Sequence, residues 1–170
     1  MDLNHDYSEP VMSIGTLAEK VGLSGSAVRK YENESLIIAH RTPSGHRRFS
    51  YEDIDRIRNI HRMIQVLGIS IEGIRRLQAL LPCWELLPCS PQKREKCPAH
   101  QDNTRPCWMI RELDCTPSHG NECRQCAIYR FGSLCTEHIK SIVHNQSDSK
   151  DASEAIRKLI DRKRRFRKES

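Results

Sequence analysis

All eight cysteines of the chain lie between residues 83 and 135. Six of the eight prolines fall in nearly the same region, between residues 82 and 117. Each proline removes a backbone donor that a helix needs, so a long helix cannot pass through this stretch. Few aliphatic side chains accompany the cysteines, and small domains with a thin core commonly need a cross-link or a metal. The stretch therefore predicts an irregular, metal-dependent domain.

The clustering also predicts how the chain divides. The part before the cysteines has none, and a polar joint, HNQSDSKD, leads from them to a basic tail. We expect a mainly α-helical protein with a small two-stranded wing. The expected segments are a disordered N-terminus (1–12), a winged helix-turn-helix domain (13–81), a Cys-rich segment that binds metal or an iron-sulfur cluster (82–139), a linker (140–150), and a basic amphipathic helix and tail (151–170).

The N-terminal part begins with signals for two short helices. Ser13 can cap a helix with apolar residues at helical spacing, and Gly22 can end it. A short turn follows, and Ser24 or Ser26 can cap a second helix that carries basic residues. This order predicts a helix-turn-helix of about twenty residues.

Two short strands and two more helices are expected next. The apolar run 36–38 predicts one strand, the Pro-Ser-Gly at 43–45 signals a turn, and HRRFS at 46–50 predicts the returning strand. Helices capped near Ser50 and by Ser70 follow. The apolar faces that we expect on these two helices comprise Ile54, Ile57, Ile60, Ile64 and Leu67, and then Ile71, Ile74, Leu77 and Leu81.

Charge points to the partner. The formal net charge is +6 and the isoelectric point is near 9.0, which suggests a polyanion or an anionic membrane. A basic second helix fits the major groove of DNA, and a basic wing can reach the neighbouring backbone or minor groove. No apolar run is long enough to span a membrane, and the N-terminus has no signal-peptide pattern. We therefore expect a cytoplasmic protein bound to double-stranded DNA and not to a membrane.

Two stretches carry a family resemblance, SIGTLAEKVGLSGSAVRKYENESLI and RTPSGHRRFSYEDIDRIRNIHRMIQVLGISIEGIRRL. In order, spacing and turn positions they resemble the winged-helix DNA-binding domain of MerR-type bacterial transcription regulators. The resemblance implies promoter DNA, a homodimer and RNA polymerase as partners, and a place at the bacterial nucleoid. The DNA-contact residues that it implies are Ser26, Arg29, Lys30, Tyr31, Arg41, His46, Arg47 and Arg48. Arg29 and Lys30 would read bases and the others phosphates. Alternatively, Tyr31 is a core residue of the domain and not a DNA contact.

The cysteines are candidate metal ligands. Disulfides do not persist in the reducing compartment where a DNA-binding protein works, so metal or iron-sulfur ligation is the leading interpretation. Only Cys123 and Cys126 form the close pair that is typical of structural zinc, and the looser spacing elsewhere favours an iron-sulfur cluster. Both cofactors stay open, as do two four-cysteine sites. The candidate ligands are Cys83, Cys89, Cys97, Cys107, Cys115, Cys123, Cys126 and Cys135, with His100, His119 and His138 as possible substitutes.

A repeated dipeptide suggests an internal duplication. Cys83-Trp84 and Cys107-Trp108 are each followed by two further cysteines at similar intervals. This resembles small bacterial Cys-rich modules with two Cys-Trp dipeptides. The tryptophans could shield a cluster from water or simply fill the core.

The last segment predicts an amphipathic helix. Asp151 and Glu154 form a capping box ahead of an apolar stripe and a basic face. It could supply the dimer contact that the usual long helix of the MerR type would make.

These features predict a DNA-binding transcription regulator whose Cys-rich segment senses metal or redox state. A constitutive or architectural DNA-binding protein, with a structural zinc domain that binds a protein partner, is the alternative. An enzyme is not expected, because no nucleophile, base and orienting acid stand in a recognisable order.

Overall fold

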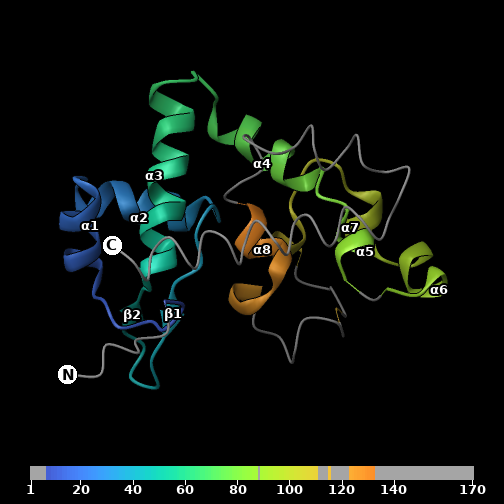
Figure 1. The fold of residues 1–170 in the computed structure, drawn as a ribbon, viewed down its shortest axis with the longest axis horizontal. Helices are drawn as coiled ribbons and strands as arrows, with labels where there is room; N and C mark the ends of the chain where they lie inside the picture. Colours follow the sequence, from blue (N-terminus) through green and yellow to red (C-terminus); the bar gives the residue numbers. More distant parts are fainter. Residues whose placement is uncertain (1–6, 88, 111–114, 116–122, 133–170) are drawn as a thin grey trace, which may run out of the picture.

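The computed structural model describes residues 7–87, 89–110, 115 and 123–132. The N-terminal elements follow the expected order of helix, helix, two strands, helix and helix (Figure 1). They are α1 (Ile14–Val21), α2 (Gly25–Asn33), β1 (His40–Arg41), β2 (Arg47–Arg48), α3 (Tyr51–Gln65) and α4 (Ile71–Ala79). The predictions for residues 1–6 and 133–170, including the linker, the C-terminal helix, Cys135 and His138, lie outside the described residues, as does His119.

The two helices of the helix-turn-helix begin at predicted caps, and the first ends at the predicted glycine. Ser13 caps α1 by accepting a hydrogen bond from the Thr16 amide, and Gly22 ends it in the left-handed conformation with φ of 69°. Of the two candidate caps of α2, Ser24 is the one that accepts a backbone hydrogen bond, from the Ala27 amide. A left-handed φ is costly for residues other than glycine, so Gly22 fixes the turn between the helices.

The wing consists of β1, β2 and the turn between them. The strands are antiparallel, with His40 opposite Arg48 and Arg41 opposite Arg47. The predicted strand at 36–38 is wrong, since β1 begins only at His40. Leu36 and Ile37 are instead fully buried in the core. The apolar character of this run reflects burial in the core. The Leu36 and Ile37 amides donate to the Tyr31 carbonyl at the end of α2 and not to a strand.

The core of the N-terminal domain lies between α1, α2, the wing and α3. Ile54, Ile57 and Ile60 of α3 and Ile74 of α4 are buried in it, as predicted. Leu67 is an exception, because it is 48 % exposed. Helix α3 ends at Gln65, so Leu67 no longer follows the helical spacing that would have placed it on the buried face.

The Cys-rich segment contains short helices in place of one long helix (Figure 1). Proline precedes or opens four of them, as Pro82, Pro91, Pro98 and Pro106. Its elements are α5 (Cys83–Leu86), α6 (Pro91–Glu95), α7 (Pro98–Gln101), η1 (Cys107–Met109), η2 (Cys123–Gln125) and α8 (Ala127–Gly132). Figure 1 shows α8 between the N-terminal domain and the α5–α7 group, and α8 packs against α5. Among the described residues, none of the helices has both the length and the apolar character needed to cross a membrane.

Candidate nucleic-acid interface

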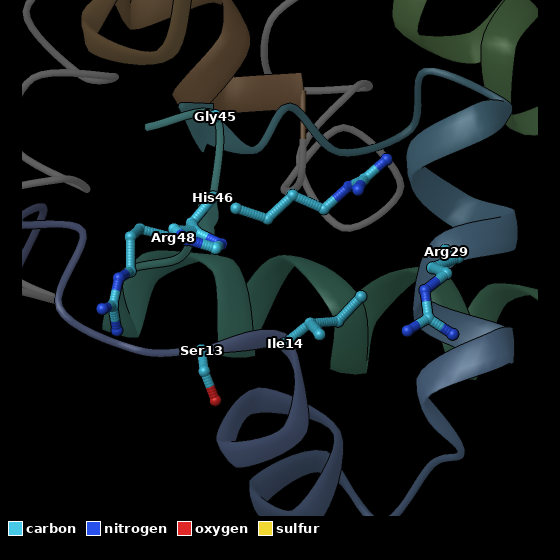
Figure 2. Close-up of a pocket in the computed structure, with 7 residues that line it drawn as sticks. Ser13, Ile14, Arg29, Gly45, His46 and Arg48 are labelled. Carbon is cyan, nitrogen blue, oxygen red and sulfur yellow. The ribbon is translucent and has the colours of Figure 1, made fainter. Parts of the chain in front are cut away.

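An open pocket forms where α1, α2 and the wing meet (Figure 2). Its lining residues are Ser13, Ile14, Arg29, Gly45, His46, Arg47 and Arg48. Three arginines and a histidine therefore surround one opening, although they come from α2 and from a wing about twenty residues later. Such a concentration of cationic side chains at one opening suits an anionic ligand such as a phosphate.

The basic residues of α2 face solvent. Ser26, Arg29 and Lys30 are exposed, while the intervening apolar face of the helix packs into the core through Val28. An exposed basic face on the second helix of a helix-turn-helix is the arrangement that enters a major groove.

Tyr31 belongs to the core and not to the exposed face. Its side chain is 6 % exposed, and its hydroxyl oxygen lies 3.3 Å from Nδ1 of His61 on α3. Burial raises the pKa of the Tyr31 hydroxyl above its ordinary value. The core alternative therefore fits this residue, and we remove Tyr31 from the proposed DNA contacts.

The wing presents its charges around a tight turn. Arg41, His46 and Arg48 are exposed, and Arg47 is partly buried. The turn depends on Gly45, whose φ of 81° disfavours other residues. The Thr42 side chain accepts a hydrogen bond from the His46 amide at 3.1 Å, which holds the tip of the wing closed.

An acidic residue that the sequence analysis missed controls two of these arginines. Glu32 on α2 accepts hydrogen bonds from Nε of Arg47 at 2.6 Å and from Nη2 of Arg41 at 3.2 Å. These ion pairs tie the wing to the second helix. Arg41 and Arg47 are thus partly neutralised, whereas Arg29 and Arg48 form none of the ion pairs found among the described residues. In the sequence, nothing but an acidic residue close to several basic ones indicated these ion pairs.

The described cysteines converge from several short helices. Burial raises the pKa of the Cys107 thiol well above its usual range, and the nearby charges of Cys83, Cys126, Cys123 and Cys115 raise it further. Burial likewise raises the pKa of Cys83 to about 11, with additional effects from Cys97, Cys115, Cys89 and Cys126. Within the described part of the chain, no disulfide joins the thiols of Cys83, Cys89, Cys97, Cys107, Cys123 or Cys126. Thiols from distant positions are therefore close enough to interact electrostatically.

Thiols are suitable ligands for a metal ion, but the described cysteine side chains are not arranged as a metal site in this structure. Clustered thiols that resist ionisation on their own are stabilised as thiolates by a cation. However, among residues 7–87, 89–110, 115 and 123–132, no three His, Cys, Asp or Glu side chains are grouped as metal ligands would be. His100 packs edge-on against Trp84, with ring centroids 4.6 Å apart, which supports a packing role for that histidine.

Comparisons with known proteins agree with the geometry of the N-terminal part. Residues 12–81 match the family model of the MerR HTH family regulatory proteins, so this part of the chain is a MerR-type helix-turn-helix domain. The matched region ends just before the first cysteine.

Several curated relatives are similar to this same N-terminal part of the chain. The chain is 34 % identical over 68 residues to the putative heat shock protein HspR of Streptomyces coelicolor, which covers 40 % of this chain and 45 % of that protein. It is 36 % identical over 69 residues to the HTH-type transcriptional regulator HmrR of Rhizobium leguminosarum bv. viciae, covering 41 % and 53 %. It is 40 % identical over 65 residues to the mercuric resistance operon regulatory protein of Bacillus cereus, covering 38 % and 48 %. The chain spans about half the length of the curated relatives it matches.

Proposed function

We propose that the protein is a DNA-binding transcription regulator that places α2 in the major groove of duplex promoter DNA and the wing on the adjacent backbone. The observation that carries this proposal is the pocket where Arg29 of α2 meets His46, Arg47 and Arg48 of the wing. Relatives that are named transcription regulators support it.

The residues divide by what they can reach. Arg29 and Lys30 lie exposed on α2, where they contact base edges. Ser26 at the start of that helix and Arg41, His46, Arg47 and Arg48 on the wing contact phosphates, which fixes the register of the domain on the duplex. From the resemblance to MerR-type regulators we also propose that the protein acts as a homodimer on a palindromic element, together with RNA polymerase, in the cytoplasm.

The test compares one α2 arginine with one wing arginine. A selected DNA sequence is first obtained from a random pool with the full-length protein, and binding is then measured against variant sequences over a range of salt. Arg29→Ala should weaken binding at the selected sequence and relax base preference there by about 1–3 kcal/mol. Arg48→Ala should weaken binding on all sequences alike and lower the salt slope by about 1. Equal losses on every sequence for both variants would contradict the assignment, and no duplex binding at all would exclude the function.

We further propose that the Cys-rich segment binds an iron-sulfur cluster or zinc and that its state alters DNA affinity. The mutual approach of Cys83, Cys107, Cys115, Cys123 and Cys126 supports this, and Cys89, Cys97 and Cys135 are the remaining candidate ligands. A bound cation would supply the positive charge that keeps these thiols ionised.

Anaerobic purification followed by visible absorption and assay of iron, sulfide and zinc tests the cofactor. Iron with stoichiometric sulfide indicates a cluster, whereas a colourless protein with stoichiometric zinc indicates a zinc site. Affinity for the selected sequence is then compared before and after stripping, with folding checked by circular dichroism. Identical affinities in two folded states would refute sensing.

A further inference from the structure

Helix α8 of the Cys-rich segment supplies a hydrogen-bond partner to the backbone that leads into the wing. The Ile38 amide donates to the hydroxyl oxygen of Tyr129 at 2.8 Å. Tyr129 is only 4 % exposed, and Ile38 stands two residues before β1. Ile38 lies outside the paired residues of the wing, so removing the phenolic oxygen would take away the partner that its amide has in this structure.

The same entry segment is held at two more points. Trp108 donates from its indole nitrogen to the Ser35 carbonyl at 2.9 Å. Arg56 of α3 donates from Nε to the Leu36 carbonyl at 2.6 Å and from Nη1 to the Tyr129 carbonyl. Residues 35, 36 and 38 are therefore fixed by Trp108, Tyr129 and the arginine that Tyr129 contacts.

Aromatic packing makes these contacts one unit. The Arg56 guanidinium, 3 % exposed as a residue, lies 3.8 Å from the Tyr129 ring centroid and 5.2 Å from that of Trp108. The two rings meet edge to face with centroids 5.3 Å apart. A buried guanidinium over two aromatic faces fixes the relative position of the rings.

Both η2 and α8 are also joined to the start of α3. Nη2 of Arg124 donates to Oδ2 of Asp53 at 2.8 Å, and Arg130 forms an ion pair with Glu52. Asp53 is 2 % exposed and also accepts a hydrogen bond from the Ser50 amide, directly after the wing. The segment 123–132 thus contacts the chain on both sides of the wing, before β1 and after β2.

We propose that Tyr129 is a positioning residue for the wing, which it holds in place for DNA through Ile38. This inference rests on the proposed function, because the position of the wing affects binding only if the wing contacts DNA. It also gives the cysteines a route to DNA, since Arg124 lies between Cys123 and Cys126 and Tyr129 follows Cys126 by three residues. A ligand that moves these two cysteines moves the anchor of the wing.

The test replaces single hydroxyl groups in the full-length protein. Tyr129→Phe removes the partner of Ile38 and keeps the ring on Arg56. Tyr7→Phe is the matched control, because Tyr7 also donates its hydroxyl to a residue of α3, Asp55 at 2.6 Å. Amide hydrogen exchange is measured without DNA, and affinity for a selected duplex is measured separately.

We expect Tyr129→Phe to speed exchange at Ile38 and in β1 and β2 by about tenfold, with α1 unchanged. DNA affinity should fall several-fold at the same salt concentration, and Tyr7→Phe should change neither quantity at the wing. Trp108→Phe, which removes the hydrogen bond to the Ser35 carbonyl, should also speed exchange in the wing and lower DNA affinity. This variant replaces Tyr129→Phe in the test if Tyr129→Phe does not fold.

Wild-type exchange in the wing of the Tyr129→Phe variant would overturn the proposal. So would accelerated exchange with unchanged affinity in a protein that binds DNA. If the wild-type protein binds no duplex, the proposed function fails, while the exchange rates still decide whether Tyr129 holds the wing.

Discussion

Glu32 and Arg47 join the second helix of the helix-turn-helix to the wing, with 2.6 Å between Oε2 and Nε. The same carboxylate pairs with Arg41 on the neighbouring strand, and the Glu32 side chain is only 12 % exposed. Two elements that contact DNA in the proposed complex are thus held at a fixed separation by one acid. The acid also offsets part of the positive charge that these two arginines bring to the DNA.

Replacing Glu32 by Gln should loosen this restraint and release charge. Arg41 and Arg47 would then meet the phosphates without a competing carboxylate, so affinity for non-specific duplex should rise. The slope of log affinity against log salt should steepen by about 1–2, because each added phosphate contact releases about one counterion. Discrimination between selected and random sequences should fall. Glu72→Gln on α4, whose pair with Arg76 is exposed and local, is the control. An unchanged salt slope would show that Glu32 does not compete with the phosphates for Arg41 and Arg47.

Local signals made most of the N-terminal fold predictable. Ser13, Gly22, Ser50 and Ser70 stand where the structure begins or ends helices, because capping depends on only a few neighbouring residues. The exposed basic residues of α2 and the wing turn at Gly45 followed from the same kind of signal. The strand predicted at 36–38 is wrong because a short apolar run is equally compatible with a strand and with a buried segment of another structure.

Long-range contacts could not be predicted in this way. Arg56 is a charged residue on an amphipathic helix, yet it is buried and bonded across 73 residues to Tyr129. The Arg75 guanidinium on α4 likewise donates to the Glu34 carbonyl at 3.0 Å, across 41 residues of the sequence. No spacing rule connects such residues, since their contacts depend on how distant segments of the chain fold against one another.

Tyr31→Phe should leave DNA binding almost intact. The ring is buried, and the variant loses only the hydroxyl contact with His61. We expect affinity within about twofold of wild type and a stability loss of about 0.5–1.5 kcal/mol in urea unfolding. Lys30→Ala, from the adjacent exposed position, should show the reverse pattern of weaker binding and little change in stability. A tenfold loss of affinity in Tyr31→Phe at wild-type stability would return Tyr31 to the DNA contacts.

Arg56→Lys should destabilise the protein although the charge is kept. A lysine ammonium cannot reach the Leu36 and Tyr129 carbonyls together, and it lacks the planar group that packs on the two rings. We expect a loss of about 2–4 kcal/mol in the free energy of unfolding, since a buried charge would lose part of its hydrogen bonding. Arg58→Lys on the same helix, where Nη2 of an exposed arginine bonds to the Lys20 carbonyl, should cost less than about 1 kcal/mol. Equal effects would indicate that the Arg56 contacts contribute little to stability.

Gly132→Ala should disturb the contact between α8 and Trp108. An added Cβ would lie 2.7 Å from Cη2 of Trp108, whose ring is held by its bond to the Ser35 carbonyl. Overpacking of this kind costs about 1–3 kcal/mol, and thermal unfolding would measure it. Gly25→Ala is a suitable control, because its added Cβ would meet no atom within 4 Å. If Gly132→Ala is as stable as Gly25→Ala, α8 does not pack on Trp108 in solution.

Cys107 should react slowly with iodoacetamide in protein that has been stripped of metal and remains folded. Burial and the neighbouring thiols hold the pKa of Cys107 well above its usual range, so little of it is thiolate at pH 7–8. Its alkylation rate, followed by peptide mass spectrometry, should rise about tenfold per pH unit and show no plateau by pH 9, whereas N-acetylcysteine levels off above its pKa of about 8.5. Adding Zn(II) should protect Cys107 and release protons, because a metal displaces the proton from each thiol that binds it. A plateau below pH 8 would show that Cys107 is less buried in solution, or farther from the other thiols, than in this structure. Alkylation unaffected by Zn(II) would exclude Cys107 as a zinc ligand.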